Sequence, residues 1–421
     1  MITDNNKRIA KNTLMLYLRM FLTMAVSLFT VRIVLKTLGA VDYGLYNVVG
    51  GVVAMLTILS SSMAPASQRF FSFELGKENN IQLKRTFSLT LSIYFIFGVI
   101  LLILAETVGL WFLKTKMEIP ADREFASFWV YQFSIASFLV TIIAIPYNAA
   151  IIAHENLKVF AYISILEVIL KLAVVYLLLV FNYDKLIVYS ILLFFTTLII
   201  NSIYRIYCVR KYSECKYEFY WDKDLFKSLL GFSGWTLFGV FARMLNNQGI
   251  NILLNIFFGP VVNATRAIAS RVSSVVNQFV TNFLKAVQPQ ITKNYAGGEK
   301  VKMMKLVFQS TRFSFYMLLL VTIPILFEAN FILTIWLDDL PDYVVIFTRL
   351  IILTSFIDLL TYPLNDVSAA TGNIKIYQTV AGSIMILNLP ISYLVLNMGY
   401  PPQSTMYVLI IILSVGFSSG Y

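Results

Sequence analysis

The chain has 421 residues, of which 58% are apolar and only 13% are charged, and its mean hydropathy is +0.76. A soluble domain is about 45–50% apolar and about 25% charged, so this composition excludes a soluble enzyme, a disordered chain and a disulfide-rich secreted scaffold. The net charge of +11 would suit a nucleic-acid ligand in a soluble protein, but cytoplasmic loops of membrane proteins also collect Lys and Arg. We therefore expect a multi-spanning membrane protein with no nucleic-acid partner.

Twelve apolar runs, taken in chain order, are long enough to cross a membrane as helices. Each comes close to or exceeds the roughly 20 residues that a bilayer core requires, and strands would leave backbone groups unpaired in lipid. The runs cover residues 13–35, 44–64, 87–112, 125–150, 159–180, 186–207, 229–258, 261–287, 307–328, 344–366, 376–397 and 404–421. The opening MITDNNKRIAKN is short and basic and no small-residue cleavage site follows it, so we expect the first run to stay as an uncleaved anchor. The last run reaches Tyr421, so we expect the sequence to stop inside or just after the twelfth helix.

The distribution of Lys and Arg predicts the orientation of these runs. Twenty of these residues fall in the loops on one side and five in the loops on the other. The positive-inside rule places the richer side, together with the N-terminus, in the cytoplasm.

Two sequence matches at nearly the same offset predict an internal repeat. PYNAAIIAHENLKVF at 146–160 aligns with PLNDVSAATGNIKIY at 363–377, and GKENNIQLKRTF at 76–87 aligns with GGEKVKMMKLVF at 297–308. We predict an all-α integral membrane fold with twelve transmembrane helices in two six-helix lobes, residues 1–208 and 227–421. The linker 209–226 is expected to form an amphipathic helix at the cytoplasmic interface. Because six is even, the pseudo-twofold axis should run along the membrane normal.

Charged side chains near the middle of spans are the candidate functional residues, because each is costly in hydrocarbon unless it faces a cavity or a partner. Small polar residues beside them would also suit helix packing. Together with arginine, they favour a water-filled cationic cavity for an anionic passenger, because Arg binds phosphate through a bidentate fork. The expected substrate-binding set on spans 1, 7 and 8 is Arg19, Arg243, Asn247, Asn251, Asn255, Arg266 and Arg271.

The other charged positions suggest ion coupling. Glu167 and Lys171 lie four residues apart on the fifth span, which predicts an internal ion pair. A role for Glu167 or Asp358 in coupling to H⁺ or Na⁺ is the alternative. Two cysteines and a single histidine exclude a disulfide framework and a histidine metal cluster. No enzymatic motif is present, so neither an enzyme nor a cofactor is predicted.

Three stretches carry a family resemblance. They are RIVLKTLGAVDYGLYNVV (Arg32 to Val49), NIFFGPVVNATRAIASRV (Asn255 to Val272) and AVQPQITKNYAGGE (Ala286 to Glu299), with a basic residue, Arg69, after the second span. These stretches resemble the Wzx-type O-antigen and polysaccharide flippases, which belong to the multidrug/oligosaccharidyl-lipid/polysaccharide (MOP) superfamily.

This resemblance implies a two-lobed transporter of the bacterial cytoplasmic membrane. Such flippases carry undecaprenyl-diphosphate-linked oligosaccharide, an O-antigen or capsule repeat unit in lipopolysaccharide or polysaccharide biosynthesis, from the cytoplasmic to the periplasmic leaflet by alternating access. The multidrug branch extrudes cations and uses acids in its N-terminal lobe, whereas spans 1 and 2 here carry Arg19 and Arg32 and no acid. We expect a monomeric flippase whose other partners are membrane lipids and H⁺ or Na⁺. A cation-coupled multidrug antiporter is the alternative, and a membrane glycosyltransferase or polymerase is less favoured.

Overall fold

The computed structural model describes residues 2–117, 119–180, 183–337 and 340–418, and within these ranges it contains helices and loops but no strand. Eight of the described helices are long and apolar enough to cross a membrane. The predicted all-α membrane fold is therefore confirmed, while the number of twelve crossings stays a prediction. The chain divides into two compact units, Met1–Leu230 and Gly231–Tyr421. The finer limits expected for the lobes and the linker stay a proposal.

The first unit contains six α-helices and the start of a seventh. They are α1 (Ile2–Gly76), α2 (Asn80–Leu104), α3 (Leu110–Lys116), α4 (Glu124–Ala153), α5 (Leu157–Val180) and α6 (Lys185–Lys211). A π-helical turn at Ala105–Gly109 joins α2 to α3, and short 3₁₀ turns lie at Ala121–Arg123 and Ser213–Cys215. The second unit contains most of α7 (Lys223–Ala296), followed by α8 (Lys300–Phe327), α9 (Ala329–Leu337), α10 (Val344–Thr371), α11 (Lys375–Asn397) and α12 (Ser404–Ser418).

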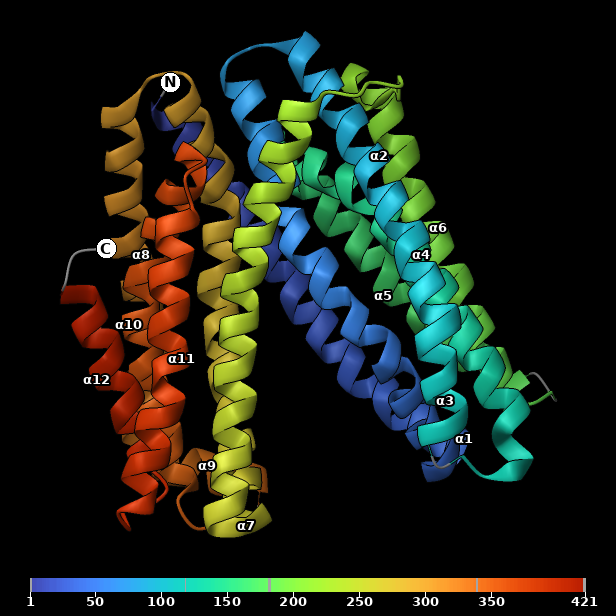
Figure 1. Ribbon diagram of the computed structural model, residues 1–421, viewed down its shortest axis with the longest axis vertical. Coiled ribbons are helices and arrows are strands. Elements are labelled where there is room, and N and C mark those ends of the chain that lie inside the picture. The colour runs from blue at the N-terminus through green and yellow to red at the C-terminus, as the bar shows by residue number, and fades with distance from the viewer. Residues whose placement is uncertain (1, 118, 181–182, 338–339, 419–421) are drawn as a thin grey trace. The chain divides into compact units, whose positions relative to one another are not determined.

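The two longest helices, α1 and α7, each reverse at a glycine. Gly39 has φ 79° and ψ 169°, and Gly259 has φ 79° and ψ −175°, a backbone conformation that is essentially restricted to glycine. Figure 1 shows α1 doubling back along itself in blue and α7 doing so from yellow to gold. Each of these helices therefore supplies two antiparallel arms, which is why the sequence predicts two spans in each.

Turns at matching positions of the two units support the predicted repeat. The turn after α4 has Glu155 at φ 58° with its N–H donating to Ile152 O, and the turn after α10 has Gly372 at φ 83° with its N–H donating to Ala369 O. These pairs are separated by the offset of the 146–160 and 363–377 match. The turns after α1 and α7 likewise place Glu78 and Gly298 at positive φ. The positive-φ residues of these two turns are thus separated by one residue fewer than the offset of the second sequence match.

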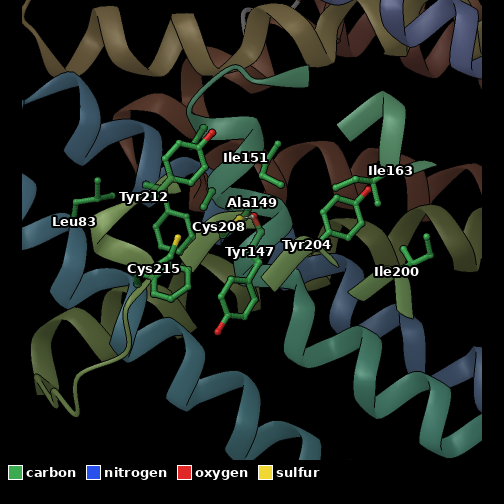
Figure 2. Packing of buried hydrophobic residues seen from close by; sticks show 14 residues of the cluster. Leu83, Tyr147, Ala149, Ile151, Ile163, Ile200, Tyr204, Cys208, Tyr212 and Cys215 are labelled. Atoms are coloured by element: carbon green, nitrogen blue, oxygen red, sulfur yellow. Dashed lines mark hydrogen bonds between the residues drawn. The ribbon is translucent and has the colours of Figure 1, made fainter. Parts of the chain in front are cut away.

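The linker between the units differs from the expected amphipathic helix. After α6 ends at Lys211, one 3₁₀ turn and an irregular segment lead to α7 at Lys223. Tyr212 and Cys215 are buried in a core with Cys208 of α6 and Tyr147 of α4, as Figure 2 shows. The expectation was wrong because these linker residues fill the end of the first unit, where a surface helix could not place them.

Three further contacts hold the linker against the first unit. His154 stacks on Tyr212 with ring centroids 4.0 Å apart and contacts the carboxylate of Glu214. Lys84 of α2 pairs with Glu218 at 2.6 Å. Burial alone would raise the pKa of Glu214, but hydrogen bonds from His154 and the backbone bring it below the ordinary value.

An arginine clamp closes the other end of the first unit. The Arg123 guanidinium contacts Asp42, just after the α1 reversal, and Asp184, which caps α6, at 2.6 Å each. Burial raises the pKa of Asp42 above its ordinary value, and the adjacent Arg123 opposes this rise. One cation thus ties α1, the 3₁₀ turn before α4 and the start of α6 together.

Candidate functional site

Arg243 lies on the first arm of α7, where its side chain is exposed. It interacts electrostatically with Asp358 of α10, which is half-buried. Among the residues that the structure describes, no ion pair of 4 Å or less joins Arg243 to Asp358. The carboxylate therefore acts on the arginine from a distance and leaves its N–H groups able to bind another anion.

Two tyrosines complete this cluster. Tyr362 of α10 and Tyr377 of α11 both lie within the field of Arg243 and Asp358. The Tyr377 hydroxyl donates to Thr361 O at 3.4 Å, which fixes the ring between α10 and α11. One turn further along α10, Asp366 accepts a hydrogen bond from Gln288 of α7 at 2.9 Å. Three helices thus build one polar region in the second unit.

Arg266 has partners that the sequence did not indicate. It lies on the second arm of α7 and is buried, and its guanidinium donates to the Asn251 carboxamide and, at 3.4 Å, to the Asn247 carbonyl and carboxamide oxygens. These asparagines lie on the first arm, so the three residues join the two arms across the Gly259 reversal. A substrate role for them stays a prediction, and the geometry gives them a structural one.

Two further members of the predicted set, Asn255 and Arg271, have exposed side chains. Asn255 lies just before the Gly259 reversal and Arg271 after it, on opposite arms of α7. The structure therefore divides the six α7 members into Arg243 beside Asp358 of α10, the Arg266 junction, and these two exposed residues, while Arg19 belongs to the other unit.

Arg19 of α1 lies in a second charged cluster. Its guanidinium is 5.1 Å from the centroid of the Phe160 ring, and it interacts electrostatically with Glu167 of α5 and Tyr204 of α6. The expected ion pair is confirmed, because Lys171 Nζ contacts Glu167 Oε1 at 2.6 Å. Two cations therefore share one carboxylate.

The aromatic partners of the two arginines are equivalent in the repeat. Phe160 and Tyr377 are the last residues of the aligned segments 146–160 and 363–377, and each lies beside an arginine from the first arm of the long helix in its own unit. The sequence reasoning missed both rings. The alignment of 146–160 with 363–377 pairs the two rings, whereas the pattern of charges points to neither.

Comparison with known proteins was consistent with a transporter. A family model described as polysaccharide biosynthesis protein matches residues 9–295. No curated protein matches the chain.

Solved structures with the same fold are transporters. A MATE crystal structure in complex with MaD3S superposes with a TM-score of 0.80 at 12% identity, covering 99% of this chain and 95% of that one. A MOP superfamily transporter from Pyrococcus furiosus, described as having a binding pocket of reversed polarity that suggests a different function, gives 0.76 at 11% identity over 98% and 95%. A mutant of the Vibrio cholerae MATE transporter VcmN gives 0.73 at 16% identity over 99% and 96%. At these identities the likeness establishes the fold alone.

Proposed function

The chain belongs to the polysaccharide biosynthesis protein family of MOP-superfamily membrane transporters, and on this premise we propose that it flips a polyprenyl-diphosphate-linked oligosaccharide. The glycan moves from the cytoplasmic to the periplasmic leaflet of the bacterial cytoplasmic membrane by alternating access. An O-antigen or capsule repeat unit joined to undecaprenyl diphosphate is the proposed cargo. The N-terminus is cytoplasmic, the protein acts as a monomer, and no enzymatic step is involved.

The observation that carries this proposal is the exposed Arg243. Its planar fork matches two phosphate oxygens, and the Tyr362 hydroxyl beside it can donate a further hydrogen bond to a diphosphate. Asp358 limits the cost of keeping this charge within the membrane when no substrate is bound. A site of this kind can bind the diphosphate and still release it.

Extrusion of cationic drugs is the second candidate, and the fold likeness to MATE structures supports it. The charges argue against it, because Arg19 on α1 would repel a cation and the acid that interacts with it, Glu167, is already paired with Lys171. For the Pyrococcus furiosus transporter, too, reversed polarity of the binding pocket is described as suggesting a different function.

We propose that an H⁺ or Na⁺ gradient drives transport, with Asp358 as the coupling acid. Asp358 interacts electrostatically with Arg243, so binding of H⁺ or Na⁺ to this carboxylate would change the charge that a diphosphate meets at the site. Full flipping in proteoliposomes without any gradient would contradict the coupling, but not the choice of cargo.

Export of surface glycan, measured against protein abundance, tests the cargo in a strain that lacks its own flippase. Arg243→Ala should abolish export at near-normal abundance, and Arg243→Lys should restore it in part because lysine offers a point charge in place of the fork. Arg349, an exposed arginine of α10, supplies the matched control, and Arg349→Ala should export normally.

Two outcomes would contradict the assignment. Normal export by a well-expressed Arg243→Ala protein would remove Arg243 from the substrate site. Low abundance of Arg243→Ala that Asp358→Asn restores, still with normal export, would make the two residues a structural pair.

Orientation needs a designed thiol, because Cys208 and Cys215 are buried and a hydrogen bond with Cys208 together with burial raises the pKa of Cys215. Lys216 in the linker is exposed. Lys216→Cys should react with a membrane-impermeant maleimide only after the membrane is opened, and labelling in intact spheroplasts would reverse the proposed topology.

A further inference from the structure

A pocket of about 320 Å³ lies wholly within the first unit, between α1, α4, α5 and α6. Its volume is within the range of about 300–1,000 Å³ that is typical of small-molecule sites. It belongs to the first unit, whereas the Arg243 cluster belongs to the second. Among the lining residues that the structure describes, Lys171 is the one charged residue and none is a carboxylate.

The hydroxyl groups around this pocket are oriented by the helices that carry them. Ser137 and Thr141 of α4 donate to backbone carbonyls one turn earlier, at 2.7 and 2.8 Å. Ser190 and Thr197 of α6 do the same, at 2.8 and 2.9 Å. A hydroxyl has a single hydrogen to donate, so each of these oxygens offers only acceptor lone pairs to the pocket. The lining suits a ligand that is rich in O–H or N–H donors.

Lys171 adds one site of opposite character. Its ammonium group has three N–H donors, of which Glu167 occupies one, and Arg19 interacts electrostatically with the same carboxylate. Two cations against one carboxylate leave an excess of one positive charge at this edge of the pocket. A ligand anion can therefore pair with Lys171 without displacing any other acid.

Aromatic rings complete the lining. Tyr46 packs edge-on to Tyr189, and Phe133 stacks on Trp129 with ring centroids 5.7 Å apart, so both rings have fixed orientations. The face of an aromatic ring carries partial negative charge, which suits the polarised C–H groups on one face of a pyranose.

We propose that this pocket binds a sugar carrying a carboxylate, a hexuronic acid, with the carboxylate on Lys171 and the ring hydroxyls donating to the acceptor oxygens. This inference rests on the proposed function, because it makes the pocket a subsite for one residue of the transported glycan. Lys171 offers a carboxylate one positive charge, whereas the Arg243 fork in the second unit can bind a diphosphate through two N–H groups.

Binding is tested with the full-length protein in lipid nanodiscs. The probes are the methyl glycosides of glucuronic acid and of glucose, which differ only at C6, a carboxylate in the first and a hydroxymethyl group in the second. Saturation-transfer NMR measures the affinity of each. The wild-type protein should prefer the glucuronide by roughly tenfold, since a hydrogen bond to a charged group contributes about that factor. Lys171→Gln should abolish the preference and leave glucoside binding unchanged, while Lys171→Arg should retain it. The exposed Lys185 of α6 supplies the control Lys185→Gln, which should behave as wild type.

A second variant distinguishes a binding role from a structural one. Glu167→Gln frees Lys171 from its partner and should increase glucuronide affinity, which loss of a merely structural pair would not do. Thr141→Val and Thr197→Val should weaken both sugars together. Equal affinity for the two probes, an unchanged preference in Lys171→Gln, or no binding of either probe would overturn the inference. If glucuronide fails to bind while glycan export persists, only this inference falls. If glucuronide binds as expected but no lipid-linked glycan is exported, the proposed function falls and the pocket stands.

Discussion

The two units use the same backbone devices for different chemistry. Each begins with a long helix that reverses at a glycine of nearly identical φ and ψ, Gly39 or Gly259. Each places an arginine beside the aromatic residue that ends its aligned segment. Around this shared frame the first unit has the Arg123 clamp and a hydroxyl-lined pocket, whereas the second has the Arg266 junction and the Arg243–Asp358 cluster.

The repeat preserves backbone conformation more closely than side-chain function. Glu155 and Glu78 adopt positive φ where the second unit has Gly372 and Gly298, so even the residue type at a turn has diverged while the turn has not. The arginines that hold each unit together are likewise not equivalent. Arg123 joins helices to a turn in the first unit, and Arg266 joins two arms of one helix in the second.

The largest loss of stability is expected when the Arg123 clamp of the first unit is removed. Arg123→Ala leaves the buried Asp42 without its counter-charge and should lower the free energy of unfolding by about 3 kcal/mol. Thermal melting of the purified protein measures this loss. Asp42→Asn in the same protein should recover part of it, because the neutral side chain no longer needs the arginine. A wild-type melting temperature for Arg123→Ala would show that the clamp does not stabilise the first unit.

Removing the second unit's junction should cost somewhat less. Arg266→Leu deprives Asn247 and Asn251 of a charged donor and should lower the free energy of unfolding by about 2 kcal/mol. The melting temperature and glycan export should fall together. If export fails while melting is unchanged, Arg266 serves the substrate and not the helix junction.

A matched pair of glycine substitutions tests whether the helix reversals in the two units are equivalent. Gly39→Ala and Gly259→Ala each force a side chain into a backbone region that only glycine adopts readily, and each should cost about 1–2 kcal/mol. Gly44→Ala and Gly234→Ala are the controls, since an added methyl meets no atom within 4 Å and neither glycine has a positive φ. These controls should be neutral or slightly stabilising. A large difference between Gly39→Ala and Gly259→Ala would mean that the two reversals are not equivalent.

The smallest effect concerns the linker, which packs on the first unit. Glu214 has a lowered pKa, so its ionised form stabilises the folded state at any pH above the ordinary value of 4.5, and this stabilisation is lost as pH falls below it. Glu214→Gln should therefore lower stability at pH 7 by about 1 kcal/mol. The melting difference between wild type and variant should shrink towards pH 4, and a difference that grows there would reverse the sign.

The sequence predicted the membrane fold and the repeat because both depend on local patterns, namely apolar length and aligned segments. It also predicted the Glu167–Lys171 pair, since residues four apart on a helix must meet. The Arg266 junction was beyond reach, because periodicity assigns a residue to a face of its own arm and does not show that the other arm returns to it. The Lys171 pocket was hidden for a similar reason. Its lining comes from α1, α4, α5 and α6, and no pattern within one helix shows that these residues meet.

The reversal at Gly39 has a consequence for biogenesis. No loop separates the arms of α1, so both must enter the bilayer together as a helical hairpin with Asp42 near its tip. Arg123 follows 81 residues later in the chain, and therefore leaves the ribosome after that hairpin is complete. Asp42 is therefore made, and its hairpin completed, before the arginine that pairs with it exists. The full clamp also needs Asp184, so it can form only after the start of α6 has been synthesised.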